Sequence, residues 1–380
     1  MIKKIVLTGL VLISMTAFSC APQDMPLSVE LTGQNSTGSN IAPTENNSQN
    51  HITANIADKV KINAVVIQPA QNQVNTYIVD YAKMDTDKVI NLLKLNKKEL
   101  EKESKKDYFL SGEERYHTSG GDSFYILPGS VIYNSRFSQF ILGVMNYANK
   151  DRMRIGYRNP FDTDTPNNTN AEDSARDKAI VLLSALNIDA SVISLYQMKH
   201  DILEKYEKQI ENDLSYKDAI DSGNLILKKQ WSLEDDCCYI QLAPMIDGIC
   251  LDNKDRPIGS SDSFYPPSTI DIIMTAKGIQ MLNISNVYRP ISTQDKNKTI
   301  LSVEAIVERI TTKYSSILVK KPVTIKEIAL VYTPFIIDKR QEAPYLLKPS
   351  WRVTIETQDD SFLLTSYVYF DAFTGDEIMQ

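Results

Sequence analysis

Three of the four cysteines in this 380-residue sequence lie close together and could carry redox or metal chemistry. Cys237 and Cys238 are adjacent, and Cys250 follows on the strand that we expect to return from a turn at Asp247–Gly248. Neighbouring residues of a strand point to opposite faces, so only one of Cys237 and Cys238 can readily reach Cys250. One alternative is a disulfide from Cys250 to one of them, and the other is three reduced, mostly buried thiols. Three thiolates, two of them adjacent, do not complete a tetrahedral zinc site, so we predict no metal and no cofactor.

Histidine and the common catalytic motifs add little to this chemistry. The sequence has three histidines, His51, His117 and His200, and we expect each of them at a polar or solvated position. It contains no G-x-S-x-G elbow, H-E-x-x-H helix, P-loop or G-x-G-x-x-G turn. We therefore predict that the protein is not an enzyme. The alternative is a hydrolase that uses two carboxylates facing one cleft.

A short acidic stretch begins like a calcium-binding loop. Asp162 and Asp164 supply its first two carboxylates. Asn167 stands where such a loop needs a turn glycine, and Asp173 stands where it closes with glutamate. We therefore predict no calcium site.

The charge balance limits the possible partners. The chain has 48 Asp and Glu residues against 41 Lys and Arg residues, a formal net charge of −7. A surface that binds nucleic acid needs clustered positive charge, so we predict no nucleic-acid partner.

The first nineteen residues have the pattern of a secretory signal peptide. Lys3 and Lys4 form a positively charged start, and residues 5–17 form an apolar stretch that is too short to span a bilayer comfortably. We assign residues 1–19 to this signal.

The residue that follows the signal is a cysteine, Cys20, and the arrangement resembles the signal of bacterial lipoproteins. It departs from the usual pattern at Ala17 and Phe18, where leucine and a small residue are common. The resemblance implies that Cys20 is lipidated and becomes the mature N-terminus. The protein would then be held by this lipid on the extracytoplasmic face of a membrane. The alternative is an ordinary secreted protein cleaved near this point.

Residues 20–57 read as a flexible tether. They are rich in Asn, Ser, Thr, Gln, Gly and Pro and include His51. Such a segment cannot bury enough apolar surface to offset the entropy lost on ordering.

From residue 58 onward the sequence alternates between strand and helix patterns without a regular βαβα order. We expect strands at 59–67, 75–81, within 114–137, and at 191–198, 237–251, 269–290, 323–337, 344–358 and 361–378. We expect helices at 85–95, 171–188, 200–220 and 300–316, the last with Ser302 as its N-cap. These elements predict an α+β fold with two lobes of antiparallel sheet and helices packed on one face. We place the N-terminal lobe at 58–215 and the C-terminal lobe at 216–380.

The last two expected strands carry a recognisable set of residues: Pro349, Trp351, Tyr369, Asp371 and Gly375. This pattern resembles the closing hairpin of PepSY-type domains and of the YycH and YycI regulatory proteins. The stretch at 239–251 and the helix at 302–314 are similar to further parts of the same group. The resemblance implies a non-catalytic extracytoplasmic module that binds a partner protein, restrains a protease or tunes a sensor kinase.

Two functions therefore remain to be compared. The first is a lipid-anchored regulatory protein that binds another protein. The second is a surface lipoprotein that binds cell wall or glycan, which the nineteen tyrosines and the long tether would suit. A glycan-binding surface would gather tyrosines along one sheet face, whereas we expect them mostly dispersed in strand packing.

Overall fold

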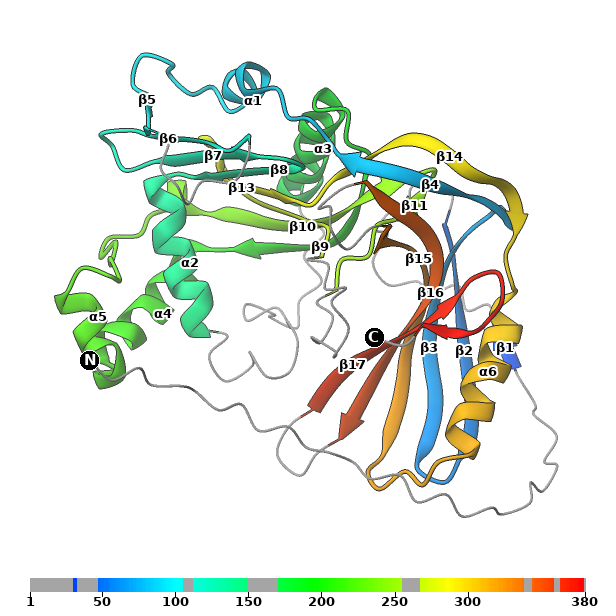
Figure 1. The fold of residues 1–380 in the computed structure, drawn as a ribbon. Helices are drawn as coiled ribbons and strands as arrows, with labels where there is room; N and C mark the ends of the chain where they lie inside the picture. The colour runs from blue at the N-terminus through cyan, green and yellow to red at the C-terminus, as the bar shows by residue number, and fades with distance from the viewer. Residues whose placement is uncertain are drawn as a thin grey trace, which may run out of the picture.

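The structure, a computed structural model, describes residues 30–32, 47–104, 112–148, 170–254, 267–337, 344–358 and 363–378. It confirms an α+β fold built on two nine-stranded sheets (Figure 1). One sheet uses the beginning and end of the chain, and we call it the terminal sheet. The other uses the middle of the chain, and we call it the middle sheet. In Figure 1 the middle sheet crosses the top of the molecule and the terminal sheet runs down the right.

The terminal sheet has the order β1-β2-β3-β15-β16-β17-β18, and β4 joins it by pairing with both β16 and β14. Its strands are β1 (Glu30–Thr32), β2 (Asn47–Ala57), β3 (Val60–Pro69), β4 (Gln73–Tyr81), β14 (Tyr288–Thr299), β15 (Val323–Ile336), β16 (Tyr345–Gln358), β17 (Leu363–Asp371) and β18 (Glu377–Ile378). The pairing between β3 and β15 is parallel, which differs from the wholly antiparallel sheets that we expected. The sheet is therefore mixed.

The middle sheet has the order β11-β10-β12-β13-β8-β7-β6-β5, and β9 pairs with β10. Its strands are β5 (Glu101–Lys102), β6 (Glu114–His117), β7 (Ser123–Leu127), β8 (Ser130–Asn134), β9 (Ala190–Met198), β10 (Cys237–Ile246), β11 (Ile249–Cys250), β12 (Thr269–Thr275) and β13 (Gly278–Ser285). All of its pairings are antiparallel.

The helices are distributed differently on the two sheets. In the terminal sheet, α6 (Val303–Ser315) packs on one face, as expected. The middle sheet is covered on both faces, which corrects the expectation of a single covered face. One face packs against α1 (Thr86–Leu92) and α3 (Asn170–Ala185). The other packs against α2 (Arg136–Ala148), α4 (His200–Asn212) and α5 (Lys217–Asp221).

Local sequence explains where these elements begin. In β3 the alternating residues from Val60 to Val66 are buried, while Lys61 and Asn63 between them are exposed, as a half-buried strand requires. Ser302 caps α6 by accepting a hydrogen bond from the backbone N–H of Ala305, so the predicted N-cap is confirmed.

The middle sheet is an insertion into the terminal sheet, so the expected lobe boundary between residues 215 and 216 is wrong. The chain leaves the terminal sheet after Tyr81 and returns to it at Tyr288, and these two residues pair across β4 and β14. Strands from both sides of residue 215 pair in each sheet, as β9 with β10 and β3 with β15 show. Sequence periodicity identifies strands but does not say which distant strands pair, and this is why the boundary was misplaced.

A tight turn at Gly129 is hydrogen-bonded to both segments that connect the two sheets. The backbone N–H of Gly129 donates to the carbonyl of Ala82, and its carbonyl accepts from the N–H of Val287. Its φ of 67° favours glycine, and a Cβ atom there would lie 2.6 Å from the Tyr81 ring. Only glycine lets both crossing segments approach the turn this closely.

The turn between β10 and β11 makes a second contact between the sheets. The Tyr77 hydroxyl on β4 donates to the carboxylate of Asp247 at the tip of the turn. Leu251 forms a β-bridge with Tyr332 of β15, and the backbone N–H of Asp252 donates to the carbonyl of Tyr332. The β10–β11 hairpin is thus an arm of the middle sheet that docks on the terminal sheet.

Part of the predicted tether is a strand. Residues 47–57 form β2, in which Ile52 is fully buried and pairs with Ala64 of β3. His51 pairs with Val65 and is half-buried, so its expected place in a solvated tether is wrong. The signal peptide and Cys20 lie outside the described residues. Among the helices that the structure does describe, none is long and apolar enough to cross a membrane.

Candidate functional site

The cysteines do not form the disulfide that the sequence allowed. Cys237 and Cys238 begin β10, whereas Cys250 in the two-residue strand β11 pairs with Met245 near the other end of β10. Met245 lies seven positions after Cys238, which corresponds to about 23 Å along a strand. A disulfide needs its Cα atoms within about 7 Å, so all three thiols are free.

The thiols are also poorly suited to nucleophilic chemistry. Cys237 and Cys238 point to opposite faces of the middle sheet, into separate cores, as neighbouring strand residues should. Burial raises the pKa of Cys237 well above its ordinary value and that of Cys250 to about 11. A thiol that stays protonated at neutral pH is a weak nucleophile and a poor metal ligand.

The residues of the PepSY-like pattern close the terminal sheet. Pro349 and Trp351 lie on β16, where Trp351 is fully buried, and Tyr369 lies on the neighbouring strand β17. The Asp371 carboxylate accepts hydrogen bonds from the backbone N–H groups of Phe373 and Thr374. Gly375 has a φ of 72° in the turn that follows, and its position faces Leu301 and Arg309 at α6. These residues therefore hold the last turn against the core.

One buried cation lies where the arm meets the terminal sheet. Arg352 of β16 is 5% exposed and donates to Asp252 Oδ1 at 2.9 Å, Asn253 Oδ1 at 2.8 Å and Glu327 Oε1 at 2.9 Å. Burial alone would lower the pKa of Arg352, but the charges of Asp252 and Glu327 raise it above its usual range. Two carboxylates are thus brought together, but they share one guanidinium and so form an ion-pair cluster.

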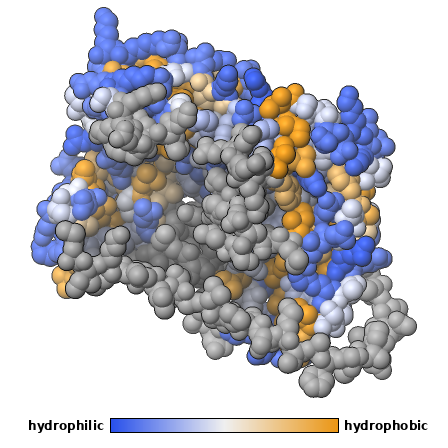
Figure 2. Space-filling view, in the orientation of Figure 1, coloured by the Kyte–Doolittle hydropathy of each residue, from blue (hydrophilic) through white to orange (hydrophobic). Residues whose placement is uncertain are grey.

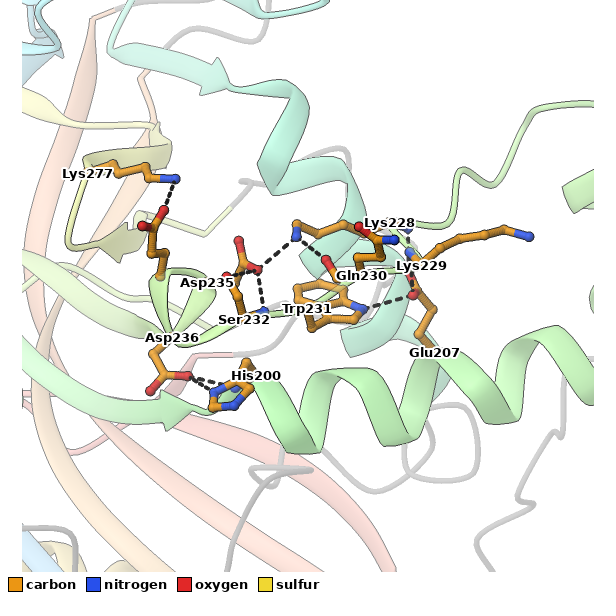
Figure 3. Close-up of polar contacts among 11 residues, drawn as sticks. His200, Glu207, Lys228, Lys229, Gln230, Trp231, Ser232, Asp235, Asp236 and Lys277 are labelled. Carbon is orange, nitrogen blue, oxygen red and sulfur yellow. Dashed lines mark hydrogen bonds and ion pairs between the residues drawn. The ribbon is translucent and has the colours of Figure 1, made fainter.

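A second group of carboxylates fixes the segment that precedes β10 (Figure 3). Glu207 of α4 is 5% exposed and accepts hydrogen bonds from the backbone N–H groups of Lys228 and Lys229 and from Trp231 Nε1. Asp235 accepts from the Lys228 ammonium at 2.8 Å and from Ser232. Donors of the same segment fill both oxygens of Glu207 and bond to Oδ2 of Asp235, which also pairs with the Lys228 cation.

His200 begins α4 and makes the one histidine–aspartate contact with hydrogen-bond geometry in the described part of the chain. Its Nδ1 lies 2.7 Å from Asp236 Oδ1, which also accepts from the His200 backbone N–H. Asp236 therefore holds the first residue of the helix in place (Figure 3). His117, at the end of β6, is exposed, as expected for a polar position at a strand end.

A row of polar side chains crosses four strands of the middle sheet. It consists of neighbours in register on β9, β10, β12 and β13: Ser194, Gln241, Asp271 and Asn283. Residues opposite one another in a sheet share a face, so these four side chains lie side by side. All four are half-buried. We call this row the polar band.

The polar band borders the core beneath α2 and α4. The next row on the same face includes the buried residues Ile273 and Met281 of that core. Beyond the band on the other side, β10 leads into the arm and β13 leads toward Tyr288 of the terminal sheet. The band therefore lies between the helix-covered core and the terminal sheet.

Asp271 is the unusual member of the band. Its Oδ1 accepts from the Tyr239 hydroxyl at 2.7 Å and from Gln241 Nε2 at 3.3 Å. Among the described residues its Oδ2 has no partner, and no cation pairs with the carboxylate. Burial raises the pKa of Asp271, although the two hydrogen bonds lower it in part. A half-buried carboxylate without a compensating charge is a candidate for a functional group.

Asn283 stands opposite Asp271 on β13 without bonding to it. Its Oδ1 accepts from Ser285 Oγ at 3.0 Å, and its Nδ2 donates to none of the described residues. On the other side of the band, Ser194 Oγ donates to Gln241 Oε1 at 2.7 Å. The band thus presents one unused acceptor and one unused donor on adjacent strands.

The tyrosines are divided between cores and this face. Among the described residues seven of them are buried, namely Tyr77, Tyr133, Tyr147, Tyr288, Tyr332, Tyr345 and Tyr369. Tyr196 and Tyr239 are half-buried neighbours beside the polar band, and their rings stack at a centroid distance of 6.2 Å. Other tyrosines also meet in pairs or small groups, such as Tyr81 with Tyr288 and Tyr345, but the pair Tyr196 and Tyr239 is the one beside the polar band.

Sequence reasoning did not identify the polar band. Its four residues come from segments up to 89 positions apart, and each is an ordinary polar residue in a strand pattern. The only available signal was that Asp271 interrupts the apolar stretch 270–274 and that Asn283 interrupts the apolar residues 281–284. In the described part of the chain, no group of three or more His, Cys, Asp or Glu residues could hold a metal ion. The calcium-like loop at 162–167 lies outside the described residues.

Comparison with known proteins informs the fold and not the function. No protein-family model matches the sequence, and no curated protein matches it. Among solved structures, the chain is similar to an uncharacterised protein from Eubacterium rectale ATCC 33656 with a TM-score of 0.61 and 18% sequence identity. The match covers 87% of this chain and 93% of that one. The likeness extends over both sheets and supports the α+β architecture.

Proposed function

We propose that the chain is an exported lipoprotein, held by a lipid on Cys20 at the extracytoplasmic face of a membrane, that acts by binding a partner protein without catalysis. The first twenty residues support the anchorage, because a positive start and a short apolar stretch lead directly to a cysteine. The similarity of the closing strands to PepSY-type and YycH/YycI proteins supports the regulatory role.

The structural feature that best supports a protein partner is the outer edge of β17. This strand pairs with β16 along its whole length, but β18 covers only Tyr369 and Phe370 on the other side. No described strand pairs with the outer edge of residues 363–368. An uncovered edge strand offers backbone donors and acceptors to an extended segment of another protein.

A second edge strand of the same sheet, β14, is protected by its sequence. β14 contains Pro290 and the lysines Lys296 and Lys298, and its pairing with β4 shifts register three times. Such features discourage strand addition. β17 has no proline, no lysine and no register shift in its pairing with β16. Figure 2 shows hydrophobic residues on the terminal-sheet side of the visible face and also on its left side.

Anchorage is tested with the full chain and its Cys20→Ala variant expressed in a bacterium that processes lipoproteins. The full chain should incorporate labelled fatty acid and sediment with membranes, and the variant should do neither. Incorporation of label by the variant, or release of both chains into the medium, would contradict the lipid anchor.

Partner binding is tested by placing a photo-crosslinking residue at Ser366, which is exposed on β17, and at Ser292, which is exposed on β14, as the matched control. A discrete adduct should form from position 366 alone. The Leu364→Lys change should abolish the adduct, because an added charge discourages strand pairing at an edge. Equal adducts from both positions, or an adduct that Leu364→Lys leaves intact, would rule out β17 as the docking edge.

A second function, binding of cell wall or glycan, has its own structural support. The stacked pair Tyr196 and Tyr239 borders the polar band, and aromatic rings beside hydrogen-bonding groups suit sugar rings. The test is sedimentation of the full chain with purified cell-wall sacculi. Failure to sediment would leave the protein-binding function as the sole candidate.

A further inference from the structure

We propose that the polar band is a binding site for a neutral, hydroxyl-rich ligand, a segment of glycan, and that Asp271 and Asn283 supply its central hydrogen bonds. This inference rests on the second function above and names the site and ligand chemistry for it.

The first argument is the arrangement of unused hydrogen-bonding groups. Asp271 Oδ2 is an acceptor and Asn283 Nδ2 is a donor, and neither has a partner among the described residues. Residues that pair directly across antiparallel strands have Cβ atoms about 5 Å apart. A hydroxyl group both donates and accepts, so neighbouring hydroxyls of a sugar can fill the acceptor and the donor together.

The second argument is that the bonds of Asp271 do not hold the fold together as those of other buried carboxylates do. Glu207 fills both of its oxygens with donors from one segment, and Glu327 is bonded to Arg352. Asp271 uses only Oδ1, and it carries the cost of partial burial without a compensating cation. Its Oδ2 is also absent from the fully buried atoms that lack a partner, so it remains open to a ligand.

The third argument is that the charges of the band disfavour other ligand classes. A single carboxylate gives too few ligands for a metal ion, and the four band residues include no cation that would bind an anion. An apolar ligand would cover the carboxylate without bonding to it, which is costly. A neutral ligand that donates hydrogen bonds avoids each of these problems.

The fourth argument is that aromatic and aliphatic residues flank the polar groups. Tyr196 and Tyr239 lie on one side, and Ile132, the cross-strand neighbour of Asn283, continues the row toward Tyr125. The guanidinium of Arg115 lies over the Tyr125 ring at 5.4 Å from its centroid. Sugar rings have apolar C–H faces and polar edges, so a mixed strip of this kind matches them better than a purely polar surface.

The experiment measures binding of the full chain, purified in detergent, to two probes by titration calorimetry. The first probe is a set of neutral β-1,4-linked N-acetylglucosamine oligomers, and the second is an anionic uronic-acid oligomer of similar length. Asp271→Asn and Asn283→Ala are the test variants. Asp295→Asn, which changes a half-buried aspartate on β14, is the matched control. We expect the neutral oligomers to bind, each test variant to weaken binding at least tenfold, and the control to leave it unchanged.

Each other result overturns the proposal. If no neutral oligomer binds, or if the anionic probe binds more tightly, the assigned ligand chemistry is wrong. If the neutral oligomers bind equally well to the wild type and both test variants, the site lies elsewhere. Sedimentation of the same variants with sacculi separates these failures: wall binding that survives Asp271→Asn and Asn283→Ala preserves the glycan-binding function while removing the polar band from it.

Discussion

Two groups of carboxylates on the same side of the middle sheet differ in how far protein donors and cations compensate their buried charge. Around the segment before β10, Glu207 of α4 and Asp235 receive five hydrogen bonds from protein donors and one ion pair with Lys228 (Figure 3). In the polar band, Asp271 receives two hydrogen bonds on a single oxygen and pairs with no cation among the described residues. The first group is closed, because Glu207 is bonded on both oxygens and Asp235 is paired with a cation, whereas Asp271 has neither feature and is left open.

The difference separates scaffold from site. A fully bonded carboxylate fixes the backbone whose N–H groups it accepts, and removing it leaves those donors unsatisfied. A partly bonded carboxylate contributes less to the fold and keeps capacity for an external partner. Substitutions in the closed groups should therefore act mainly on stability, whereas substitutions in the polar band should act mainly on binding.

The largest effect should come from the closed cluster at the junction of the sheets. Arg352→Leu would leave Asp252 and Glu327 without their shared cation and should lower the free energy of unfolding by about 3–5 kcal/mol. Urea denaturation followed by circular dichroism measures this change. The triple variant Arg352→Leu, Asp252→Asn, Glu327→Gln removes all three charges and should recover part of the loss. A single variant as stable as the wild type would show that the cluster is not a structural ion pair.

A smaller loss should follow from the closed group on α4. Glu207→Ala leaves three N–H donors without their acceptor. It should lower the free energy of unfolding by about 3 kcal/mol. Glu211→Ala on the same helix removes an exposed carboxylate that pairs with Lys229 and should cost less than about 1 kcal/mol. Equal losses in the two variants would mean that the bonds of Glu207 are not the reason for its burial.

The smallest effect is on the pH dependence of folding stability, to which Asp271 and Asp235 should contribute with opposite signs. Burial raises the pKa of Asp271 in the folded state, so the folded protein holds this proton more tightly than the unfolded chain does. The stability contributed by protonated Asp271 is present below pH 3.8 and is lost as pH rises through the raised pKa. Burial also tends to raise the pKa of Asp235, but the Lys228 ammonium and Ser232 lower it overall. The stability contributed by Asp235 is therefore present above pH 3.8 and is lost as pH falls through the lowered pKa.

Unfolding measured between pH 2.5 and pH 6 should reveal these opposite signs when the variants are compared with the wild type. Relative to the wild type, Asp271→Asn should gain stability as pH rises, and Asp235→Asn should lose it. Parallel curves for the two variants would remove the contrast between the open and closed carboxylates.

Local features of the fold follow from the sequence, but its pairing scheme does not. The alternation in 59–67 predicts β3, and the Ser302 cap predicts the start of α6, because both signals come from neighbouring residues. The parallel pairing of β3 with β15 and the covering of the middle sheet on both faces depend on contacts between distant segments. No single segment encodes such contacts.

The candidate site was even harder to predict from the sequence than the strand pairing. The sequence drew attention to Cys237, Cys238 and Cys250 because cysteines are rare, but in the structure Cys250 lies on β11, beside the far end of β10 from the other two. Asp271 carries no local signal beyond a charge in an apolar strand, and its significance comes from what does not surround it. A residue defined by missing partners can be recognised only when its neighbours in space are known.

The insertion of the middle sheet also orders the events of folding. Val60 of β3 pairs with Val323 of β15, so the terminal sheet cannot close until almost the whole chain has emerged. The middle sheet draws all its strands from residues 101–285 and can assemble earlier. During N-to-C synthesis, β2 and β3 can pair with each other, but β3 and β4 must wait for their later partners β15, β14 and β16 while the insert forms. A chaperone that shields these first strands would be most valuable during that interval.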